Sequence, residues 1–295
     1  MNPKLFLVAL LCACVPAFAE PLTQSTFTEV VKDVNVVAAS TKTAQPAAVN
    51  ELVKAPDLVR TGPQSRAELT AADQTVTRIG ANTVFSFEPT GRDMNLEKGN
   101  VLFHSPAGKG GGTIRSGGAA AAVLGTTLIV SSTGTGGFKV ILLEGKGVVT
   151  LPNGKAATLT AGQLVFVQPG QTEFGPVLTI NLGKLVAGSQ LVNGFSTTLA
   201  SMPLIQKAID EQNQQLKKGR VQDTGLTPED FGKAHQSPPK LGNGINAVDN
   251  TTYQSAVGGA ISVVQIDRIQ QLGPKAPFPP GFTPGSRGVS AVGTK

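Results

Sequence analysis

The strongest constraint on the fold of this 295-residue chain is a run of short strand-like segments between residues 58 and 182. These segments are rich in Val, Ile, Thr and Phe, and glycine-containing turns separate many of them. No helical periodicity intervenes, so the sequence predicts an all-β core: a sandwich, a jelly roll or a short β-roll. The segments span residues 66–70, 75–79, 83–87, 100–104, 121–130, 138–143, 148–151, 157–160, 164–167 and 177–180.

Two further regions flank this run. Residues 20–57 also alternate apolar and polar side chains, so we expect an N-terminal β segment that leads into the β domain of residues 58–182. Residues 221–295 are rich in Pro, Gly, Ser and Asn. Such a composition buries too little apolar surface to offset its ordering entropy, so we expect a flexible, mostly disordered Gly/Pro-rich tail.

Between the β domain and the tail, residues 183–220 predict short helices. One helix is expected over residues 185–200 and a second over residues 203–218. For the second helix we expect Ser201 as the N-cap, a proline in the first turn and Gly219 at the end.

The first 19 residues have the pattern of a secretory signal peptide. A lysine at position 4 precedes the apolar stretch of residues 5–11, and Ala17-Phe18-Ala19 forms a small-x-small cleavage site before Glu20. The apolar stretch is too short for a membrane-spanning helix, and no other segment is long enough. We therefore expect an exported protein without a transmembrane span.

Both cysteines of the chain, Cys12 and Cys14, lie inside this signal peptide. If cleavage follows Ala19, the mature protein has no disulfide, no thiol chemistry and no cysteine-based metal site. The alternative is a lipid anchor, because Leu11-Cys12-Ala13-Cys14 resembles a bacterial lipobox that would leave an acylated Cys14 at the new N-terminus.

Composition and motifs argue against several classes of function. The net charge is +6, but the basic residues are spread out, and the chain has no Trp and one Tyr. We therefore expect no nucleic-acid partner. The two histidines, His104 and His235, are far apart in sequence and have no metal-ligand spacing, and the glycine-rich loops lack the features of a phosphate loop. The acidic cluster around residues 223–230 is explained more simply as a helix cap. We expect no catalytic site, no cofactor and no metal.

Six short motifs, in order, resemble the FecR domain family. The resemblance covers roughly residues 28–170, and Leu124 replaces the basic residue that usually precedes the family's Gly-Thr pair. The motifs are Val59-Arg60-Thr61-Gly62-Pro63-Gln64-Ser65-Arg66-Ala67-Glu68-Leu69, Arg78-Ile79-Gly80-Ala81-Asn82-Thr83, Leu96-Glu97-Lys98-Gly99-Asn100-Val101, Ala121-Ala122-Val123-Leu124-Gly125-Thr126, Leu142-Leu143-Glu144-Gly145-Lys146-Gly147-Val148 and Leu159-Thr160-Ala161-Gly162-Gln163.

We interpret the motif residues as structural. The glycines are expected at strand ends, where a positive φ or a close backbone approach is needed. Arg66 and Glu68 are expected to be a surface pair, with a catalytic or ligand-binding pair as the alternative. The hydroxyl of Thr126 is expected to satisfy a neighbouring backbone group beside Gly125. The motif residues are Thr61, Gly62, Ser65, Arg66, Glu68, Asn82, Thr83, Gly99, Gly125, Thr126, Glu144, Gly145 and Gly162.

The resemblance implies a cell-envelope protein. Well-known members of the family are transmembrane regulators that join a cytoplasmic anti-sigma segment to this domain, which senses an outer-membrane receptor from the periplasm. Because a cleavable signal is expected here in place of a span, we expect a stand-alone exported module of the bacterial periplasm or cell surface.

Two functions compete at this point, and a third is related to them. The first is a non-catalytic protein-interaction module that docks another envelope protein through a strand edge or a loop face. The second is a carbohydrate or envelope-polymer binder, which the scarcity of Trp and Tyr disfavours. The third is a periplasmic signal-sensing component related to FecR-type transducers.

Overall fold

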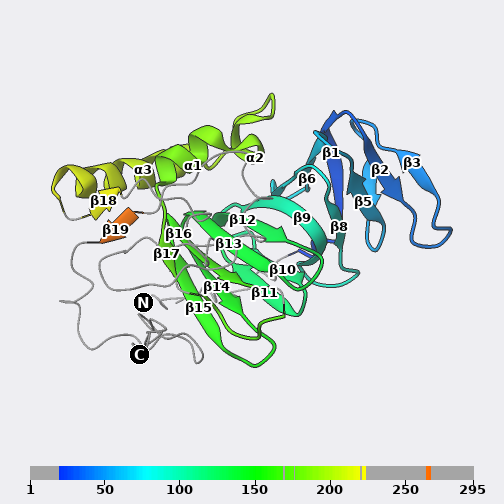
Figure 1. Cartoon of the computed structure of the whole chain (residues 1–295). Coiled ribbons are helices and arrows are strands. Elements are labelled where there is room, and N and C mark those ends of the chain that lie inside the picture. Colours follow the sequence, from blue (N-terminus) through cyan, green and yellow to red (C-terminus); the bar gives the residue numbers. More distant parts are fainter. Residues whose placement is uncertain (1–19, 169, 176, 220, 224–263, 267–295) are drawn as a thin grey trace, which may run out of the picture.

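The computed structural model describes residues 20–168, 170–175, 177–219, 221–223 and 264–266 (Figure 1). The expected signal peptide of residues 1–19 lies outside the described residues. So do residues 224–263 and 267–295, on which most of the prediction of a disordered tail falls.

Seventeen strands form two layers that share one long strand, β9 (Asp93–Ser105). Pairing is antiparallel everywhere in these layers except between β9 and β10. Sheet A has the order β4 (Leu52–Lys54), β1 (Gln24–Val31), β6 (Arg66–Thr70), β7 (Val76–Ile79), β9, β12 (Thr126–Ser132), β13 (Phe138–Glu144), β16 (Gln163–Val167) and β17 (Leu178–Thr179). Sheet B has the order β3 (Ala44–Pro46), β2 (Val34–Val37), β5 (Leu58–Thr61), β8 (Val84–Phe87), β9, β10 (Gly112–Ser116), β11 (Ala119–Val123), β14 (Lys146–Thr150) and β15 (Ala156–Thr160).

Strand β9 passes from one layer to the other at Gly99. Its first half pairs with β8 and β10 in sheet B, and its second half pairs with β7 and β12 in sheet A. Gly99 has a φ of 95°, and a Cβ atom there would lie 2.5 Å from the Cα of Thr83. Only glycine fits this crossing, because both the backbone conformation and the close approach exclude a side chain.

The space between the sheets holds the main hydrophobic core. Alternate residues of the central strands point into it, for example Phe103 on β9, Leu128 on β12 and Val140 on β13. The residues between them point to the opposite face of sheet A, where Leu102 and Ile129 join a second core. The central strands of sheet A are therefore buried on both faces, which explains their nearly continuous apolar sequence.

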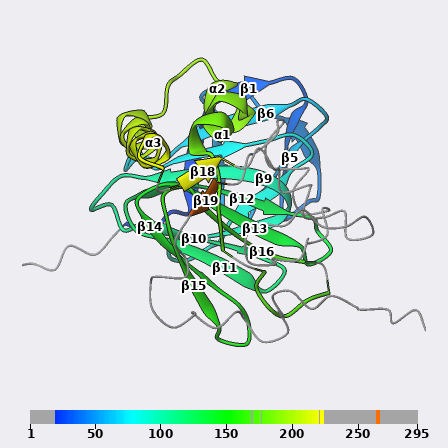
Figure 2. The same ribbon diagram turned by 60° about the vertical axis from the view of Figure 1, so that its left-hand side comes forward.

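Three helices form the second core against the outer face of sheet A (Figures 1 and 2). They are α1 (Leu182–Gly188), α2 (Gln190–Asn193) and α3 (Met202–Lys217). Figure 1 shows α1 and α3 lying across the strands of sheet A, on the side away from β10, β11, β14 and β15. No helix among the described residues has both the length and the apolar character needed to cross a bilayer.

The prediction of an all-β core followed by short helices is confirmed, with corrections to several elements. The single helix predicted over residues 185–200 is wrong, because α1 and α2 are short and residues 194–200 are not helical. The second predicted helix is α3, with a proline in its first turn. Ser201 precedes α3 but does not cap it with its side chain, because its hydroxyl contacts Thr127 in the sheet instead.

Several β elements also differ from the prediction. Strand β5 is not among the predicted segments, and β9 begins at Asp93, well before the strand predicted over residues 100–104. The segment predicted as one strand over residues 121–130 is two strands, β11 and β12, which are separated at Leu124 and Gly125. Strand β10 was missed because its glycine-rich start resembles a loop. Within the expected tail, β18 (Val221–Asp223) and β19 (Val264–Ile266) pair with each other.

Candidate functional site

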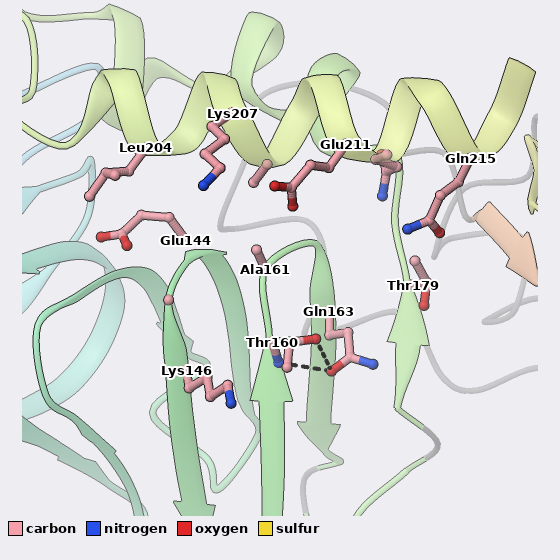
Figure 3. A pocket seen from close by; sticks show the side chains of 13 residues that line it. Glu144, Lys146, Thr160, Ala161, Gln163, Thr179, Leu204, Lys207, Glu211 and Gln215 are labelled. Carbon is pink, nitrogen blue, oxygen red and sulfur yellow. Dashed lines mark hydrogen bonds between the residues drawn. The ribbon is translucent and has the colours of Figure 1, made fainter.

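A groove runs along α3, between this helix and the turns that join the strands below it (Figure 3). Its volume is about 560 Å³. One wall is the face of α3 that carries Leu204, Lys207 and Glu211. The other wall consists of the β13–β14 turn, with Glu144 and Lys146, the β15–β16 turn and Thr179 of β17.

The surface of this groove is mixed in character. Lys207 and Glu211 give α3 both signs of charge, and Leu204 adds an apolar side chain that is 55% exposed. On the opposite wall, the Oε1 atom of Gln163 accepts hydrogen bonds from the backbone N–H and the hydroxyl of Thr160, as Figure 3 shows. The side-chain NH2 of Gln163 remains able to donate to a ligand. The groove can thus offer hydrogen bonds and apolar contact at once.

A buried polar network lies at one end of the groove. It consists of His104 on β9, Thr127 on β12, Glu144 on β13 and Ser201 at the start of α3. The hydroxyl of Thr127 lies 2.7 Å from Glu144 Oε1, 2.7 Å from Ser201 Oγ and 2.9 Å from His104 Nδ1. All four residues are buried, and the His104 Nδ1 and Glu144 Oε1 atoms are 4.0 Å apart.

The two titratable groups of the network are shifted in opposite directions. Burial lowers the pKa of His104 below its usual 6.5. Burial raises the pKa of Glu144 above 4.5, and the hydrogen bonds from Thr127 oppose this rise only in part. Both shifts favour the uncharged form, because the surroundings cannot solvate an ion as water does.

A β-bulge decides where Glu144 points. In the pairing of β12 with β13, Thr127 lies opposite Glu144 and Leu128 lies opposite Leu142, so Leu143 is an extra residue. Strict alternation would turn Glu144 into the core between the sheets, on the side of Leu142. The bulge turns it to the outer face of sheet A instead, toward α3.

A second buried polar cluster holds the segment that precedes α3. Arg78 Nε lies 2.7 Å from Glu68 Oε2, and both side chains are buried. The Arg78 guanidinium also donates to the carbonyl oxygens of Val192, at 2.7 Å, and Thr197. Its central carbon lies 4.5 Å from the centre of the Phe195 ring. Arg78 therefore ties residues 191–197 to sheet A.

This cluster corrects the prediction of a surface pair between Arg66 and Glu68. Glu68 is buried and pairs with Arg78, whereas Arg66 lies 5.6 Å from the centre of the Phe195 ring. Ala67 and Leu69 face the main core as expected. On the other face of β6, Glu68 is buried as well, because the segment before α3 covers it, while Arg66 and Thr70 are half-buried.

The structure places six of the motif residues around the crossing of β9 and the neighbouring turns. Thr61 Oγ1 donates to Gly80 O, and it accepts a bond from Thr83 N at 2.9 Å. The hydroxyl of Thr83 accepts from Asn100 N at 3.0 Å, next to Gly99. Ser65 Oγ accepts from Asp33 N, Asn82 is in a turn with a φ of 53°, and Gly62 lies against Asp33.

Five further motif residues lie near the groove. Thr126 Oγ1 lies 3.0 Å from the carbonyl oxygen of Lys146, so the expected hydrogen bond to a backbone group is present. Gly125 approaches Ala107 closely, and a Cβ atom at Gly125 would lie 3.0 Å from Ala107 Cα. Glu144 and Gly145 line the groove, and Gly162 lies against the α3 side chain of Gln212.

The Thr127 hydroxyl is enclosed by the other residues of the network. A hydroxyl beside an imidazole and a carboxylate can be a catalytic arrangement, but Thr127 is 0% exposed and a substrate atom could not reach it. In the described parts of the chain, no group of three His, Cys, Asp or Glu residues could hold a metal ion.

Sequence reasoning missed several residues of both clusters. It weighed His104 alone and gave no role to Arg78, Thr127 or Lys207. Thr127 and Arg78 each lie within or beside a motif, but nothing in the pattern distinguishes a polar residue that faces a helix from one that faces water.

Comparison with known proteins supports the motif analysis. The model of the FecR family, described as FecR protein, matches residues 57–146, so the resemblance to FecR domains is confirmed for this segment. No curated protein matches the chain.

Two crystal structures are also similar to part of the chain. Both are of a candidate anti-sigma factor from Parabacteroides distasonis ATCC 8503, at 1.65 Å and 2.50 Å resolution, with 20% identity and a TM-score of 0.40. The similarity covers 44% and 46% of this chain, and 63% and 64% of those chains, which is less than two thirds of their length.

Proposed function

We propose that the chain is a non-catalytic FecR-type module of the bacterial cell envelope that binds another envelope protein through the groove beside α3. The observation that carries this proposal is the position of the groove at the end of the segment that matches the family. The match ends at Lys146, and Glu144 to Lys146 form part of one wall of the groove. A protein ligand also suits the mixed lining, because an extended peptide needs both hydrogen bonds and apolar contact.

Carbohydrate binding is the weaker alternative. Sugar rings are usually held against aromatic side chains. The side chains that line the groove include none of this kind, and the chain has no Trp.

Site-specific photo-crosslinking in the native cells tests the proposal. A crosslinking amino acid is placed at Leu204 or Lys207 in the groove, and at the exposed Val49 in the loop between β3 and β4 as a control. We expect both groove positions to capture the same envelope protein, identified by mass spectrometry, and Val49 not to capture it. Equal capture from all three positions, or none from the groove, would overturn the proposal.

We further propose that the protein is exported after cleavage between Ala19 and Glu20. The alternative is a lipid anchor at Cys14. The intact mass of the protein from its native host distinguishes these two forms.

We also propose that the helices of residues 183–220 belong to one folding unit with the β domain of residues 58–182 and the N-terminal segment of residues 20–57. Strands β1 and β4 pair in sheet A, and the helices bury its outer face. Each part would expose apolar surface without the others.

A further inference from the structure

We propose that the buried polar network is a proton-responsive anchor for α3, through which mild acidification loosens the start of this helix and one wall of the groove. The inference concerns the groove of the proposed function. It predicts a property of the protein alone, so it can be tested without any partner.

The geometry makes this network the link between the sheet and the helix. His104, Thr127 and Glu144 come from three neighbouring strands, and Thr127 lies opposite both other residues in the pairing register. Ser201 is the fourth member and immediately precedes α3. Its hydroxyl contacts Thr127, and its carbonyl oxygen accepts from the N–H groups of Leu204 and Ile205 in the first turn of the helix. A change in the network is thus transmitted directly to this turn.

The number of hydrogen bonds that the Thr127 hydroxyl can make explains why protonation affects this network. The Thr127 hydroxyl has one hydrogen to donate and two lone pairs, and it has three partners. Thr127 is the donor toward both Ser201 Oγ and Glu144 Oε1, and its one hydrogen cannot serve both. All three partners are satisfied when Thr127 donates to Ser201 and accepts from His104 Nδ1 and from a protonated Glu144. A proton on Glu144 therefore suits the docked network, because it removes a buried charge and supplies a donor to Thr127. A proton added to the other nitrogen of His104 places a cation in a buried site.

The groups on β7 beside the network do not neutralise such a proton. The residue opposite His104 on β7 is the uncharged Val76. The Arg78–Glu68 ion pair lies on the same face of sheet A, but its two charges already pair with each other. The other charged residues on the elements that carry or contact the network are Asp93, Glu97 and Lys98 on β9, Lys139 on β13, Lys146 on β14, and Lys207, Asp210, Glu211 and Lys217 on α3.

The direction of the response follows from linkage. In a state where the start of α3 has detached, His104 and Glu144 meet water and regain pKa values near 6.5 and 4.5. Because the pKa of His104 is lower in the docked state, protons favour detachment as the pH falls below 6.5. Because the pKa of Glu144 is higher in the docked state, protons oppose detachment as the pH falls toward 4.5. Each effect changes the detached fraction by at most about tenfold per pH unit.

Hydrogen exchange of the full chain, followed by mass spectrometry between pH 7.5 and 4.5, tests the proposal. Rates are divided by the intrinsic exchange rate at each pH, so that only opening remains. For the amides of Met202, Leu204, Ile205 and Gln206 we expect opening to increase severalfold as the pH falls from 7 toward 5.5, and then to level off. Amides of β10 and β11 in sheet B provide the internal reference and should not follow this profile.

Three variants separate the two contributions. His104→Asn keeps a polar nitrogen near the position of Nδ1 and should abolish the increase in opening. Glu144→Gln should keep the increase and remove the levelling. Glu211→Gln, a matched change elsewhere in the groove, should leave the wild-type profile unchanged.

The outcomes are decisive in either direction. A wild-type profile that does not depend on pH would overturn the proposal, and so would an unchanged increase in His104→Asn. If a variant lowers overall stability, the test is the shape of its pH profile, because a general loss of stability shifts opening equally at every pH. Failure here would leave the crosslinking result untouched, and failure of crosslinking would leave the pH profile untouched.

Discussion

Replacing Arg78 with methionine should strongly destabilise the protein. Methionine keeps much of the length and the apolar volume of the arginine side chain but removes every donor. The change leaves the Glu68 carboxylate without its cation, and it leaves the carbonyl oxygens of Leu191, Val192 and Thr197 without the guanidinium. The cation–π interaction between the Arg78 guanidinium and the Phe195 ring is lost as well.

The size of the loss follows from burial. Breaking a buried ion pair by removing one partner costs about 3–5 kcal/mol, because the remaining charge is left without compensation. The two hydroxyls of Thr28 and Thr197 still donate to Glu68, so the lower half of this range is expected. For a protein of this size, 3 kcal/mol corresponds to a fall in Tm of roughly 6–12 °C.

The assay is a double-mutant cycle with Glu68→Gln, measured by thermal and chemical unfolding. The double variant should lose less than the sum of the single losses, by about 1–3 kcal/mol, because neither partner is then left charged alone. Arg115→Met is the matched control: Arg115 Nη2 and Asp93 Oδ2 are also 2.7 Å apart, but the arginine side chain is 55% exposed. That control should lose less than about 1 kcal/mol.

Two results would refute this reasoning. One is a Tm of Arg78→Met within 2 °C or so of the wild type, comparable with the exposed control. The other is strict additivity of the two single changes, which would mean that Arg78 and Glu68 act independently.

Four further predictions concern the strand turn, the network, the folding unit and export. Gly125→Val should lower the free energy of unfolding by more than about 3 kcal/mol, because it adds overpacking against Ala107 to a backbone with a φ of 66°. Thr126→Val should lower it by only about 1 kcal/mol, through the lost hydrogen bond, and urea unfolding measures both changes. Glu144→Gln should stabilise the protein at pH 8 but not at pH 4, because the raised pKa of Glu144 means that its ionised form opposes folding at higher pH. Thermal melts over this pH range measure the difference in Tm between the variant and the wild type, and a difference that does not shrink as the pH falls would contradict this. Limited proteolysis should leave a resistant fragment that extends to about the end of α3, and cleavage back to residue 182 in the intact fold would contradict the proposed folding unit. Intact mass should show a mature N-terminus at Glu20, and a diacylated Cys14 would be the contrary result.

The sequence determined the class of fold and most of the strands, because the signals involved are local. Runs of β-branched residues and glycine turns fix strand positions whatever surrounds them, and β6 matches its predicted span in full. The apolar spacing of α3 and the glycine after it similarly predict that helix. The FecR motifs depend on local sequence too, and the family match confirms them over residues 57–146.

The layers and the candidate site were decided by tertiary structure. Alternation in β6 predicts that Glu68 faces away from Ala67, but it does not show that the segment before α3 covers that outward face. In β13, a single extra residue at Leu143 reverses the direction of Glu144, and no local signal in the sequence marks this bulge. A one-residue change of register exchanges the two faces of a strand. The burial of Glu68 and the meeting of Glu144 with His104 and Ser201 therefore depend on which distant segments pack together, and a sequence pattern does not contain that information.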